Sequence, residues 1–452
     1  MSLEFRHVVL SRLYGLAWRL ARPALRRNKR MADGWSRRLV PDDWARPADL
    51  WIQAASGGEA YLVNELVNAL PPRPDGAILR ILATTWTRQG LEVLQGIRAK
   101  LRDARPDLDI EVTLFPLDSP VGMYRAVRQV NPSAVVLLET ELWPGLLFAC
   151  VRRHIPVAII NGRMTPKSLK GYRWIDRLAP GFWQAVAPAL VTATTRDDAA
   201  RFARLFDFSE DDSRLHTVSN IKFDRAAQHA ETACSTSQAH DELLRLLPDA
   251  AAHPIILLAS VREEEEVLLE PVIRKIHEQN TEATVVIAPR HMHRVESWMQ
   301  RIGQSNLSAV RRSDLTEDHP AMPGQIVIWD TFGELNALYA LAGRVFVGGS
   351  LAPLGGQNIL EPLAHGRVPL TGPYTNNFNW AMDDNGATLP GLVSAGMAVR
   401  CADANQLAAR LLDSATDSPD VVRQRFLNWL EARRGGTKRC VDLLEKLLNK
   451  TS

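Results

Sequence analysis

The stretch Trp51–Leu70, WIQAASGGEAYLVNELVNAL, passes from an apolar strand through a glycine turn into a helical pattern. A glycine turn at this place commonly cradles a phosphate, because the start of the helix presents free N–H groups. Here a glutamate, Glu59, stands directly after Ser56, Gly57 and Gly58. Since a helix start favours negative charge, we expect Glu59 to be ionised, either as a helix-capping acid or as a general base.

The same strand–turn–helix unit recurs along the chain, with helical patterns such as residues 87–102 between apolar runs. This alternation predicts an α/β fold of two Rossmann-like domains with doubly wound parallel sheets, which face a central cleft. Residues 225–250 read as a polar, helical connector, and 421–448 as a C-terminal helical stretch. The expected strands are 50–56, 78–85, 109–117, 133–139, 156–162, 189–195, 254–260, 284–290, 325–331, 344–350 and 368–372.

Composition narrows the classes of protein. The 452 residues are 46% hydrophobic and 23% charged, which is typical of a globular protein of two or three domains. A net charge of +3 argues against a nucleic-acid partner. The four cysteines lie far apart in the sequence, which argues against a disulfide framework or a structural zinc site.

The first 30 residues are the exception to this even charge balance, with eight basic residues against one acid, Glu4. Arg12 and Arg19 interrupt the apolar run, so we do not expect a helix that spans a membrane. Basic residues follow the apolar stretch as well as precede it, which fits a secretory signal poorly. We expect a basic amphipathic helix on an anionic membrane surface; the alternative is a solvated first helix packed on the domain.

Several familiar motifs are missing. The chain contains no G-x-x-x-x-G-K-[ST], no G-x-G-x-x-G at the first strand–helix turn and no G-x-S-x-G. His291 and His293 lie two residues apart but have no adjacent third ligand. We therefore predict neither a P-loop, nor a dinucleotide site, nor a metal site.

Polar residues cluster just after the predicted strands of the first half. Glu139 and Glu141 end a buried strand, where two acids need a polar cleft or partners, and extended geometry would place both on one side. Asn161 follows the next strand in the same way. Lys222 supplies a cation close to the predicted domain junction. The alternative interpretation is an ordinary lysine on the surface.

The second half supplies cations and glycines. Arg290 and His291 leave a strand end, which suits a phosphate or a sugar carboxylate. The glycine stretches 348–350 and 355–356 let backbone approach a ligand, and the helix after them attracts an anion. Glu361, one turn into that helix, is placed to accept both hydroxyls of a ribose. This division, with a base in one half and an anion site in the other, predicts a metal-independent sugar transferase. For the glycines and Glu361, the competing interpretation is a structural glycine turn followed by an acid on the surface.

The motifs SGGEA, LETELWP, INGRM, NIKFD, IAPRH, DTFGEL, FVGGSL and GGQNILEP occur in this order over residues 35–380. Together they closely resemble the family of 3-deoxy-D-manno-octulosonic acid (Kdo) transferases. The resemblance implies the GT-B fold and transfer of Kdo from CMP-Kdo to a lipid A precursor, lipid IVA, with inversion at the anomeric carbon. It implies no cofactor, and a place on the cytoplasmic face of the bacterial inner membrane.

The resemblance also implies roles for individual residues. Glu59 corresponds to the proton acceptor, and Glu139 and Lys222 to residues that stabilise the transition state. Ser56, Gly57 and Gly58 would leave room for the acceptor hydroxyl. The CMP-binding segments correspond to Pro289, Arg290, His291, Phe332, Gly333, Glu334, Gly355, Gly356, Asn358, Ile359, Leu360 and Glu361.

The chain departs from the family pattern in three places. It reads QAASGGE over residues 53–59 where His-Ser-Val-Ser-Val-Gly-Glu is frequent, and Val261-Arg262-Glu263 where Thr-His-Glu is frequent. Phe332 stands where Met is common. The change at 261–263 bears on contacts with the donor's carboxylate or phosphate.

The expected domains are 1–30, a membrane-proximal helix; 31–220, an acceptor-binding domain; 221–425, a CMP-sugar-binding domain; and 426–452, a C-terminal helix. Two alternatives stay open at this point. One is another GT-B nucleotide-sugar transferase or epimerase, and the other is a non-catalytic, membrane-associated nucleotide-binding protein.

Overall fold

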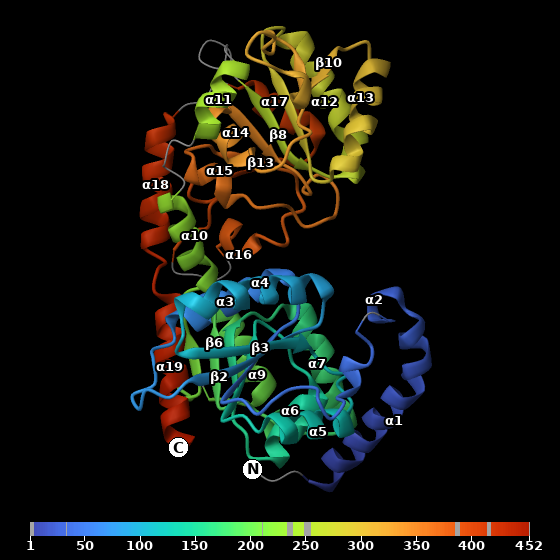
Figure 1. The fold of residues 1–452 in the computed structure, drawn as a ribbon, viewed down its shortest axis with the longest axis vertical. Coiled ribbons are helices and arrows are strands. Elements are labelled where there is room, and N and C mark those ends of the chain that lie inside the picture. The colour runs from blue at the N-terminus through green and yellow to red at the C-terminus, as the bar shows by residue number, and fades with distance from the viewer. Residues whose placement is uncertain are drawn as a thin grey trace. The chain divides into compact units, whose positions relative to one another are not determined.

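The computed structural model describes residues 4–32, 34–209, 211–232, 238–247, 255–384, 389–413 and 417–451. Contacts within the chain divide it into two compact units (Figure 1). Unit 1 comprises Met1–Arg225 and Arg433–Ser452, and unit 2 comprises Ala226–Ala432. The chain passes from unit 1 to unit 2 after Arg225 and returns after Ala432. The sequence predicts these boundaries at 220/221 and 425/426.

Unit 1 is built on a parallel sheet of seven strands in the order β3-β2-β1-β4-β5-β6-β7. The order doubles back at β1 and β4, as in doubly wound folds, so the carboxyl ends of all the strands lie along one edge. The strands are β1 (Leu50–Ala54), β2 (Leu79–Thr85), β3 (Leu108–Leu114), β4 (Ala134–Leu138), β5 (Val157–Gly162), β6 (Leu190–Ala193) and β7 (Leu215–Thr217).

Helices cover both faces of this sheet. The helices of unit 1 are α1 (Phe5–Arg27), α2 (Lys29–Ala32), α3 (Gly57–Ala69), α4 (Arg88–Ala104), α5 (Pro120–Val130), α6 (Pro144–Arg152), α7 (Pro166–Leu178), α8 (Phe182–Ala185), α9 (Arg196–Phe206) and α19 (Gly436–Thr451). Of these, α1 packs on α2, α5 and α6. A further helix, α10 (Ile221–Thr232), begins in unit 1 and crosses the boundary between the units. The last helix, α19, packs beside α3 although nearly the whole chain separates them in sequence (Figure 1).

Alternation along the strands explains why both faces are buried. Trp51 belongs to a core cluster with residues of α5, α6 and α9, whereas the next residue, Ile52, belongs to a cluster with α3, α4 and α19. All five residues of β1 are buried. A strand covered on both sides must be apolar throughout, which is why these segments read as continuous hydrophobic runs.

Unit 2 repeats the architecture with seven parallel strands in the order β10-β11-β9-β8-β12-β13-β14. Its strands are β8 (Ile256–Val261), β9 (Val285–Pro289), β10 (Ala309–Arg311), β11 (Ile326–Ile328), β12 (Arg344–Val347), β13 (Pro369–Thr371) and β14 (Val399–Arg400). Its helices are α11 (Gln238–Leu246), α12 (Glu266–Gln279), α13 (Val295–Gln304), α14 (Leu335–Leu341), α15 (Leu360–Ala364), α16 (Asn379–Met382), α17 (Ala404–Leu412) and α18 (Pro419–Glu431).

The predicted α/β fold with parallel sheets is confirmed, and each of the eleven expected strands is present. Three short strands, β7, β10 and β14, were not expected. The C-terminal stretch 421–448 contains most of α18 and most of α19, which are separated by residues 432–435. The connector 225–250 contains α10 and α11, while its residues 233–237 and 248–250 lie outside the described residues.

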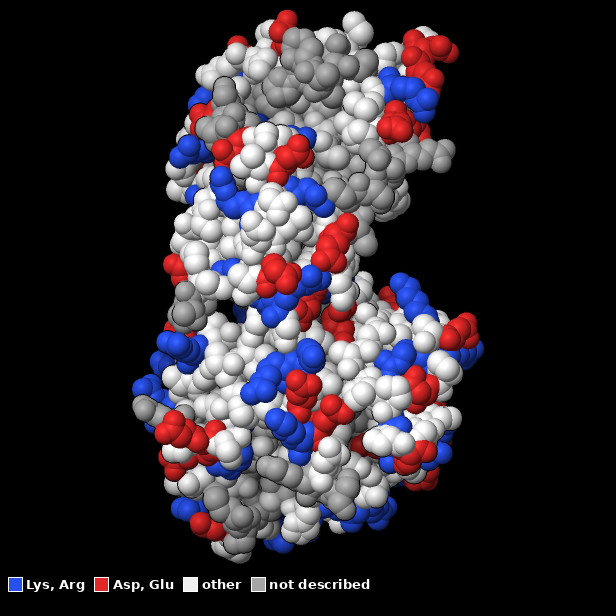
Figure 2. Space-filling model, turned by 90° about the vertical axis from the view of Figure 1, so that its left-hand side faces the viewer, with Lys and Arg blue, Asp and Glu red and all other residues white. Residues whose placement is uncertain are grey.

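The first helix packs on unit 1 through one face. The His7 ring lies 3.2 Å from the Pro180 carbonyl oxygen, and the Tyr14 hydroxyl donates to Asp118 Oδ2 at 3.0 Å. Among the described residues, no helix is both long enough and apolar enough to cross a bilayer. On the side of the molecule drawn in Figure 2, basic and acidic side chains are interspersed.

Candidate active site

The carboxyl edge of the unit 1 sheet gathers the polar residues that the sequence singled out. Glu59 follows β1, Glu139 follows the neighbouring β4, and Asn161 lies near the end of β5. Lys222 is the second residue of α10, a few residues after β7. The parallel order therefore brings residues from four separate stretches of sequence to one edge of the sheet.

Glu59 lies in the first turn of α3 and folds back on the chain that precedes the helix. Its Oε2 accepts a hydrogen bond from the Ala55 N–H at 2.5 Å, and its Oε1 accepts one from the Ser56 hydroxyl at 3.3 Å. This contact satisfies a donor before the helix start, as a capping acid does. The helix-capping interpretation and the general-base interpretation therefore describe the same side chain.

Glu59 ionises less readily than the helix start alone predicts. Burial, followed by repulsion from Glu139, raises the pKa of Glu59 from its ordinary 4.5 to about 7. Three smaller effects lower the pKa of Glu59 without cancelling the rise: the hydrogen bond from Ala55, the charge of Lys222 and the hydrogen bond from Ser56. Loss of hydration on burial outweighs the helix terminus, because the terminus contributes only about 0.3–1 kcal/mol.

Glu139 and Lys222 form an ion pair beside Glu59. Lys222 Nζ lies 2.5 Å from Glu139 Oε1, and the two side chains are only 23% and 16% exposed. Glu139 has a φ of +57°, a left-handed conformation that a non-glycine residue rarely adopts. The predicted extended geometry therefore does not hold at Glu139. Such backbone strain persists where the surrounding contacts hold it in place.

Glu141 is a third carboxylate of the same cluster. Burial, followed by the charge of Glu59, raises its pKa from 4.5 to about 8. The Trp143 ring two residues further on stacks on Trp86, with ring centroids 5.2 Å apart, and fixes this segment against the core. Three acids and one lysine thus share a small space. At neutral pH the group can therefore take up or release a proton.

Asn161 places Lys222 in this cluster. The Asn161 side chain is buried, and its Oδ1 accepts the N–H of Ile221 at 3.0 Å, so that it anchors the first residue of α10. The Asn161 N–H donates to Thr192 Oγ1 at 3.1 Å. Asp224, one turn further along α10, accepts the N–H groups of Gly435 and Thr437 at 2.7 Å. The start of α10 is thus tied both to β5 and to the start of α19.

Gly57 and Gly58 meet different surroundings. A Cβ on Gly57 would lie 3.1 Å from the Gln89 side chain, so the fold itself restricts that position. A Cβ on Gly58 would meet only Ser56 Oγ, at 3.8 Å, which is an ordinary contact. The fold of unit 1 therefore leaves open space beside Glu59 at Gly58.

In unit 2, the predicted glycine stretch 348–350 already holds an anion from the chain itself. The buried carboxylate of Glu265 accepts the N–H groups of Gly349, Ser350 and Leu351 at 2.6–2.9 Å, and that of Arg262 at 3.0 Å. These donors are used within the fold, so the first glycine stretch does not offer them to a phosphate. The only sequence signal for Glu265 was the acidic run 263–266, which reads as a solvated helix start.

The second glycine stretch is held by its neighbours in a special backbone conformation. Gly355 and Gly356 have φ values of +90° and +83°, which explains the need for glycine. Asn377 Nδ2 donates to the Gly356 carbonyl at 3.1 Å. Further along, Asn358 Nδ2 donates to Glu361 Oε1 at 2.8 Å, and Asn358 Oδ1 accepts the Leu360 N–H at 3.1 Å. The structure thus joins Asn358 and Glu361 in one hydrogen-bonded group.

The remaining residues that the sequence predicts to bind CMP lie at the carboxyl ends of β9 and β11. Pro289 ends β9, and Arg290 and His291 after it are exposed. Burial, followed by the charges of Arg262, His293 and Arg290, lowers the pKa of His291. Several cations therefore surround this ring.

After β11, the Phe332 side chain is 81% exposed. Gly333 has a φ of +87° and open space where a Cβ would lie. Glu334 accepts hydrogen bonds from Arg312, at 2.8 Å, and from the Thr331 hydroxyl. Within the described part of the chain, no group of three or more His, Cys, Asp and Glu side chains is placed to hold a metal ion.

The architecture matches that of nucleotide-sugar enzymes. The UDP-GlcNAc 2-epimerase of Neisseria meningitidis, solved with UDP-GlcNAc, aligns over 89% of this chain and 99% of its own at 10% identity, with a TM-score of 0.50. The trehalose 6-phosphate synthase of Burkholderia multivorans aligns over 90% and 99% at 12% identity, also with a TM-score of 0.50. The protein has the GT-B fold of glycosyltransferases and related epimerases.

Sequence comparison finds similarity to one group of transferases. A family model described as 3-deoxy-D-manno-octulosonic-acid transferase matches residues 26–225. The 3-deoxy-D-manno-octulosonic acid transferase of Bordetella pertussis is 28% identical over 414 residues, which cover 89% of this chain and 88% of the relative. That of Haemophilus influenzae is 28% identical over 409 residues with the same coverage. The resemblance to Kdo transferases seen in the motifs is confirmed, because the chain is similar to these relatives over most of its length.

Proposed function

We propose that this protein transfers Kdo from CMP-Kdo to a lipid A precursor, lipid IVA, with inversion at the anomeric carbon. The similarity to 3-deoxy-D-manno-octulosonic acid transferases supports the donor sugar and the reaction class. The reaction would take place at the cytoplasmic face of the bacterial inner membrane, as a step in lipopolysaccharide synthesis.

The observation that carries the proposal is the carboxylate cluster of Glu59, Glu139 and Glu141 with Lys222. A general base works best when its pKa lies near the working pH, and the pKa of Glu59 is raised to about 7. Glu59 would remove the proton from a sugar hydroxyl of the acceptor, whose oxygen then attacks the anomeric carbon of Kdo. The ion pair of Glu139 and Lys222 would stabilise the positive charge that develops on the sugar ring and hold Glu59 in place.

Unit 2 would hold the donor. Arg290 carries positive charge, and Arg290 and His291 both offer N–H donors suited to the phosphate of CMP. Asn358 and Glu361 are hydrogen-bonded to each other, so that the carboxylate is oriented to accept ribose hydroxyls. Glu334, held by Arg312, would orient the loop that presents Phe332. Fixed cations of this kind would neutralise the leaving phosphate without a metal ion.

The first helix would lie on the membrane surface. Its exposed apolar residues fall within an arc of about 80°, at 100° per residue, on the side opposite His7 and Tyr14, which contact the domain. Arginines flank this stripe, as expected for a helix at an anionic interface. The residues of the stripe are Phe5, Val9, Leu13, Leu16 and Leu20.

The test is mass spectrometry of lipid IVA after incubation with CMP-Kdo and the protein. We expect a mass increase of one or more Kdo units, and a loss of about 10²–10⁴-fold in turnover for Glu59→Gln. Glu65→Gln, the same change further along α3, is the control and should keep full activity. Turnover with UDP-sugars but not with CMP-Kdo would replace this proposal by another GT-B enzyme. Unchanged function of Glu59→Gln in cells would favour a non-catalytic binding protein.

A further inference from the structure

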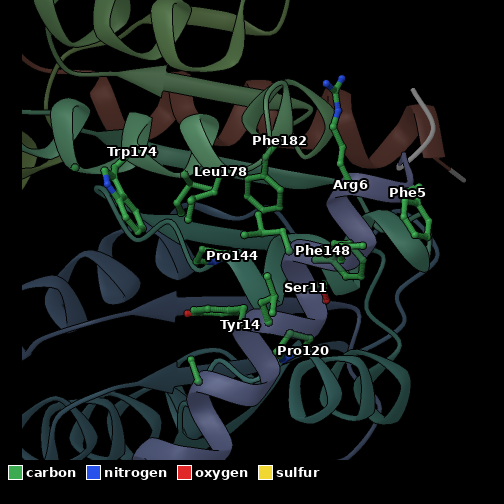
Figure 3. Close-up of a pocket in the computed structure, with 16 residues that line it drawn as sticks. Phe5, Arg6, Ser11, Tyr14, Pro120, Pro144, Phe148, Trp174, Leu178 and Phe182 are labelled. Atoms are coloured by element: carbon green, nitrogen blue, oxygen red, sulfur yellow. The ribbon is translucent and has the colours of Figure 1, made fainter.

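A large apolar pocket lies between α1 and α7 of unit 1 (Figure 3). Its volume is about 790 Å³, which is within the range of cavities that bind small molecules. Val9 and Leu13 contribute from α1, Trp174 from α7, and Pro144 and Phe148 from α6. Figure 3 shows the Trp174 and Leu178 side chains on one side of the pocket and Tyr14 of α1 on the other.

We propose that this pocket binds one fatty acyl chain of the acceptor lipid. The inference rests on the proposed function, because it assigns part of the acceptor to a place on unit 1. Three observations carry it: the apolar lining, the charges around the opening, and the short stretch of chain that joins the pocket to the carboxylate cluster.

The pocket and its rim expose apolar side chains that a water-facing surface does not need. Phe5 is 83% exposed, Trp174 57% and Leu178 58%, and all three line the pocket. Contiguous exposed apolar residues mark binding sites for apolar partners, whereas single ones are ordinary. A hydrocarbon chain would cover these side chains without leaving an unpaired polar group.

The charges around the opening favour an anionic amphiphile. Arg6 of α1 lines the pocket, and Lys167 lies one helical turn before Gly171 on the same face of α7. Long basic side chains can lay their apolar stems along a lipid and keep their charged ends at its head group. A phosphorylated glycolipid offers both partners, an acyl chain for the pocket and negative charge for the rim.

The pocket is joined to the carboxylate cluster by a very short stretch of chain. Pro144 lines the pocket, and Glu141 of the cluster lies three residues before it, so the two are at most about 11 Å apart along the backbone. The Tyr172 hydroxyl donates to the Thr140 carbonyl at 3.0 Å, which fastens α7 to this stretch. A lipid whose sugar hydroxyl reaches Glu59 would therefore have an acyl chain near the pocket. This continuity favours the acceptor over a bilayer phospholipid as the occupant.

Gly171 offers a clean way to fill the pocket. It lies within α7 and lines the pocket, and a Cβ added there would meet no atom within 4 Å. Gly171→Phe should therefore place a ring in the pocket without displacing the fold. Gly96 in α4 has the same open surroundings but lies away from the pocket, so Gly96→Phe is the matched control.

The first measurement is the Michaelis constant for the acylated acceptor. Each methylene of the acyl chain that is buried contributes a factor of about four in affinity. A ring that keeps two methylenes out of the pocket should therefore weaken binding about 15-fold. We expect Gly171→Phe to raise this constant by at least about tenfold, with kcat and the constant for CMP-Kdo unchanged. With an acceptor whose acyl chains have been removed, Gly171→Phe, Gly96→Phe and the unchanged protein should behave alike. If Gly171→Phe and the unchanged protein have equal Michaelis constants for the acylated acceptor, the proposal is overturned.

Two further readouts separate the pocket from its alternatives. A long-chain fluorescent fatty acid should bind the unchanged protein and Gly96→Phe, and be lost from Gly171→Phe. If Gly171→Phe keeps that binding, the pocket assignment fails while the transfer activity stands. If the unchanged protein binds the fatty acid but transfers no Kdo, the proposed function fails instead. If Gly171→Phe also loses binding to anionic vesicles that contain no acceptor, by the same factor as it loses the acylated acceptor, the pocket binds a bilayer lipid and the proposal is overturned.

Discussion

Replacing Glu59 by Gln should inactivate the protein and at the same time stabilise it at alkaline pH. The carboxyl of Glu59 is held by the Ala55 N–H and the Ser56 hydroxyl. Because a glutamine has only one oxygen, that oxygen would keep the bond from Ala55 while its NH2 group donates to the Ser56 hydroxyl oxygen. The main change is therefore the loss of the negative charge, which lies close to Glu139 and Glu141. Removing that charge should also lower the pKa of Glu141, because repulsion from Glu59 contributes to raising it.

The size of the effect follows from the pKa of Glu59, which is raised from 4.5 to about 7. Below pH 4.5 the carboxyl is protonated in both the folded and the unfolded chain, and the charge has no effect on stability. As the pH rises through the interval from 4.5 to about 7, only the unfolded chain ionises, so the folded state loses stability. Above pH 7 the full loss, about 3 kcal/mol as an upper bound, is present, and the glutamine variant avoids it.

Thermal unfolding measured at a series of pH values tests this reasoning. The variant and the unchanged protein should unfold at similar temperatures near pH 4. By pH 8 the variant should unfold about 5–10 °C higher. Glu65→Gln on the same helix should leave the pH dependence as it is. A variant that is less stable at pH 8, or a difference that does not change with pH, would refute the raised pKa of Glu59 and its origin in burial.

Three other substitutions test separate contacts. Lys222→Met leaves the partly buried Glu139 without its cation, and turnover should fall about 10²–10³-fold. Because the charge of Lys222 lowers the pKa of Glu59, the acid limb of the pH–rate profile should also move above pH 7, which rates measured over a pH series would show. Gly58→Leu should leave the unfolding temperature nearly unchanged but raise the Michaelis constant of the acceptor, because only the ligand is expected to occupy that space. Tyr14→Phe removes the hydroxyl that donates to buried Asp118 and should cost about 1–3 kcal/mol, seen as faster hydrogen exchange in α1.

The fold could be predicted well from the sequence because its strands are buried on both faces. Such strands are continuous apolar runs, and the turns after them carry the polar residues. The strands β7, β10 and β14 were missed because each forms an edge of its sheet, and none of their residues is fully buried. The equally short β11 and β13 are buried throughout and therefore left an apolar pattern.

The location of the candidate site was predictable, but its charge state was not. Glu59 and Glu139 were chosen because they follow strands, and Lys222 because it supplies a cation close to the predicted domain junction. The structure brings the three together. The raised pKa of Glu59 depends on burial and on acids about 80 residues away in sequence, which local reasoning cannot see. Glu265 was missed for the same reason, because only the packed sheet brings it to the loop after β12.

The contact of Glu265 with that loop bears on how unit 2 receives a nucleotide. Many glycine loops become ordered only when a phosphate arrives, and the free energy of ordering then weakens binding. In this protein a permanent internal carboxylate holds the backbone of Gly349 and Leu351 as soon as the chain folds. The protein without nucleotide should therefore keep this loop as rigid as the loaded one, and nucleotide affinity should owe nothing to its ordering.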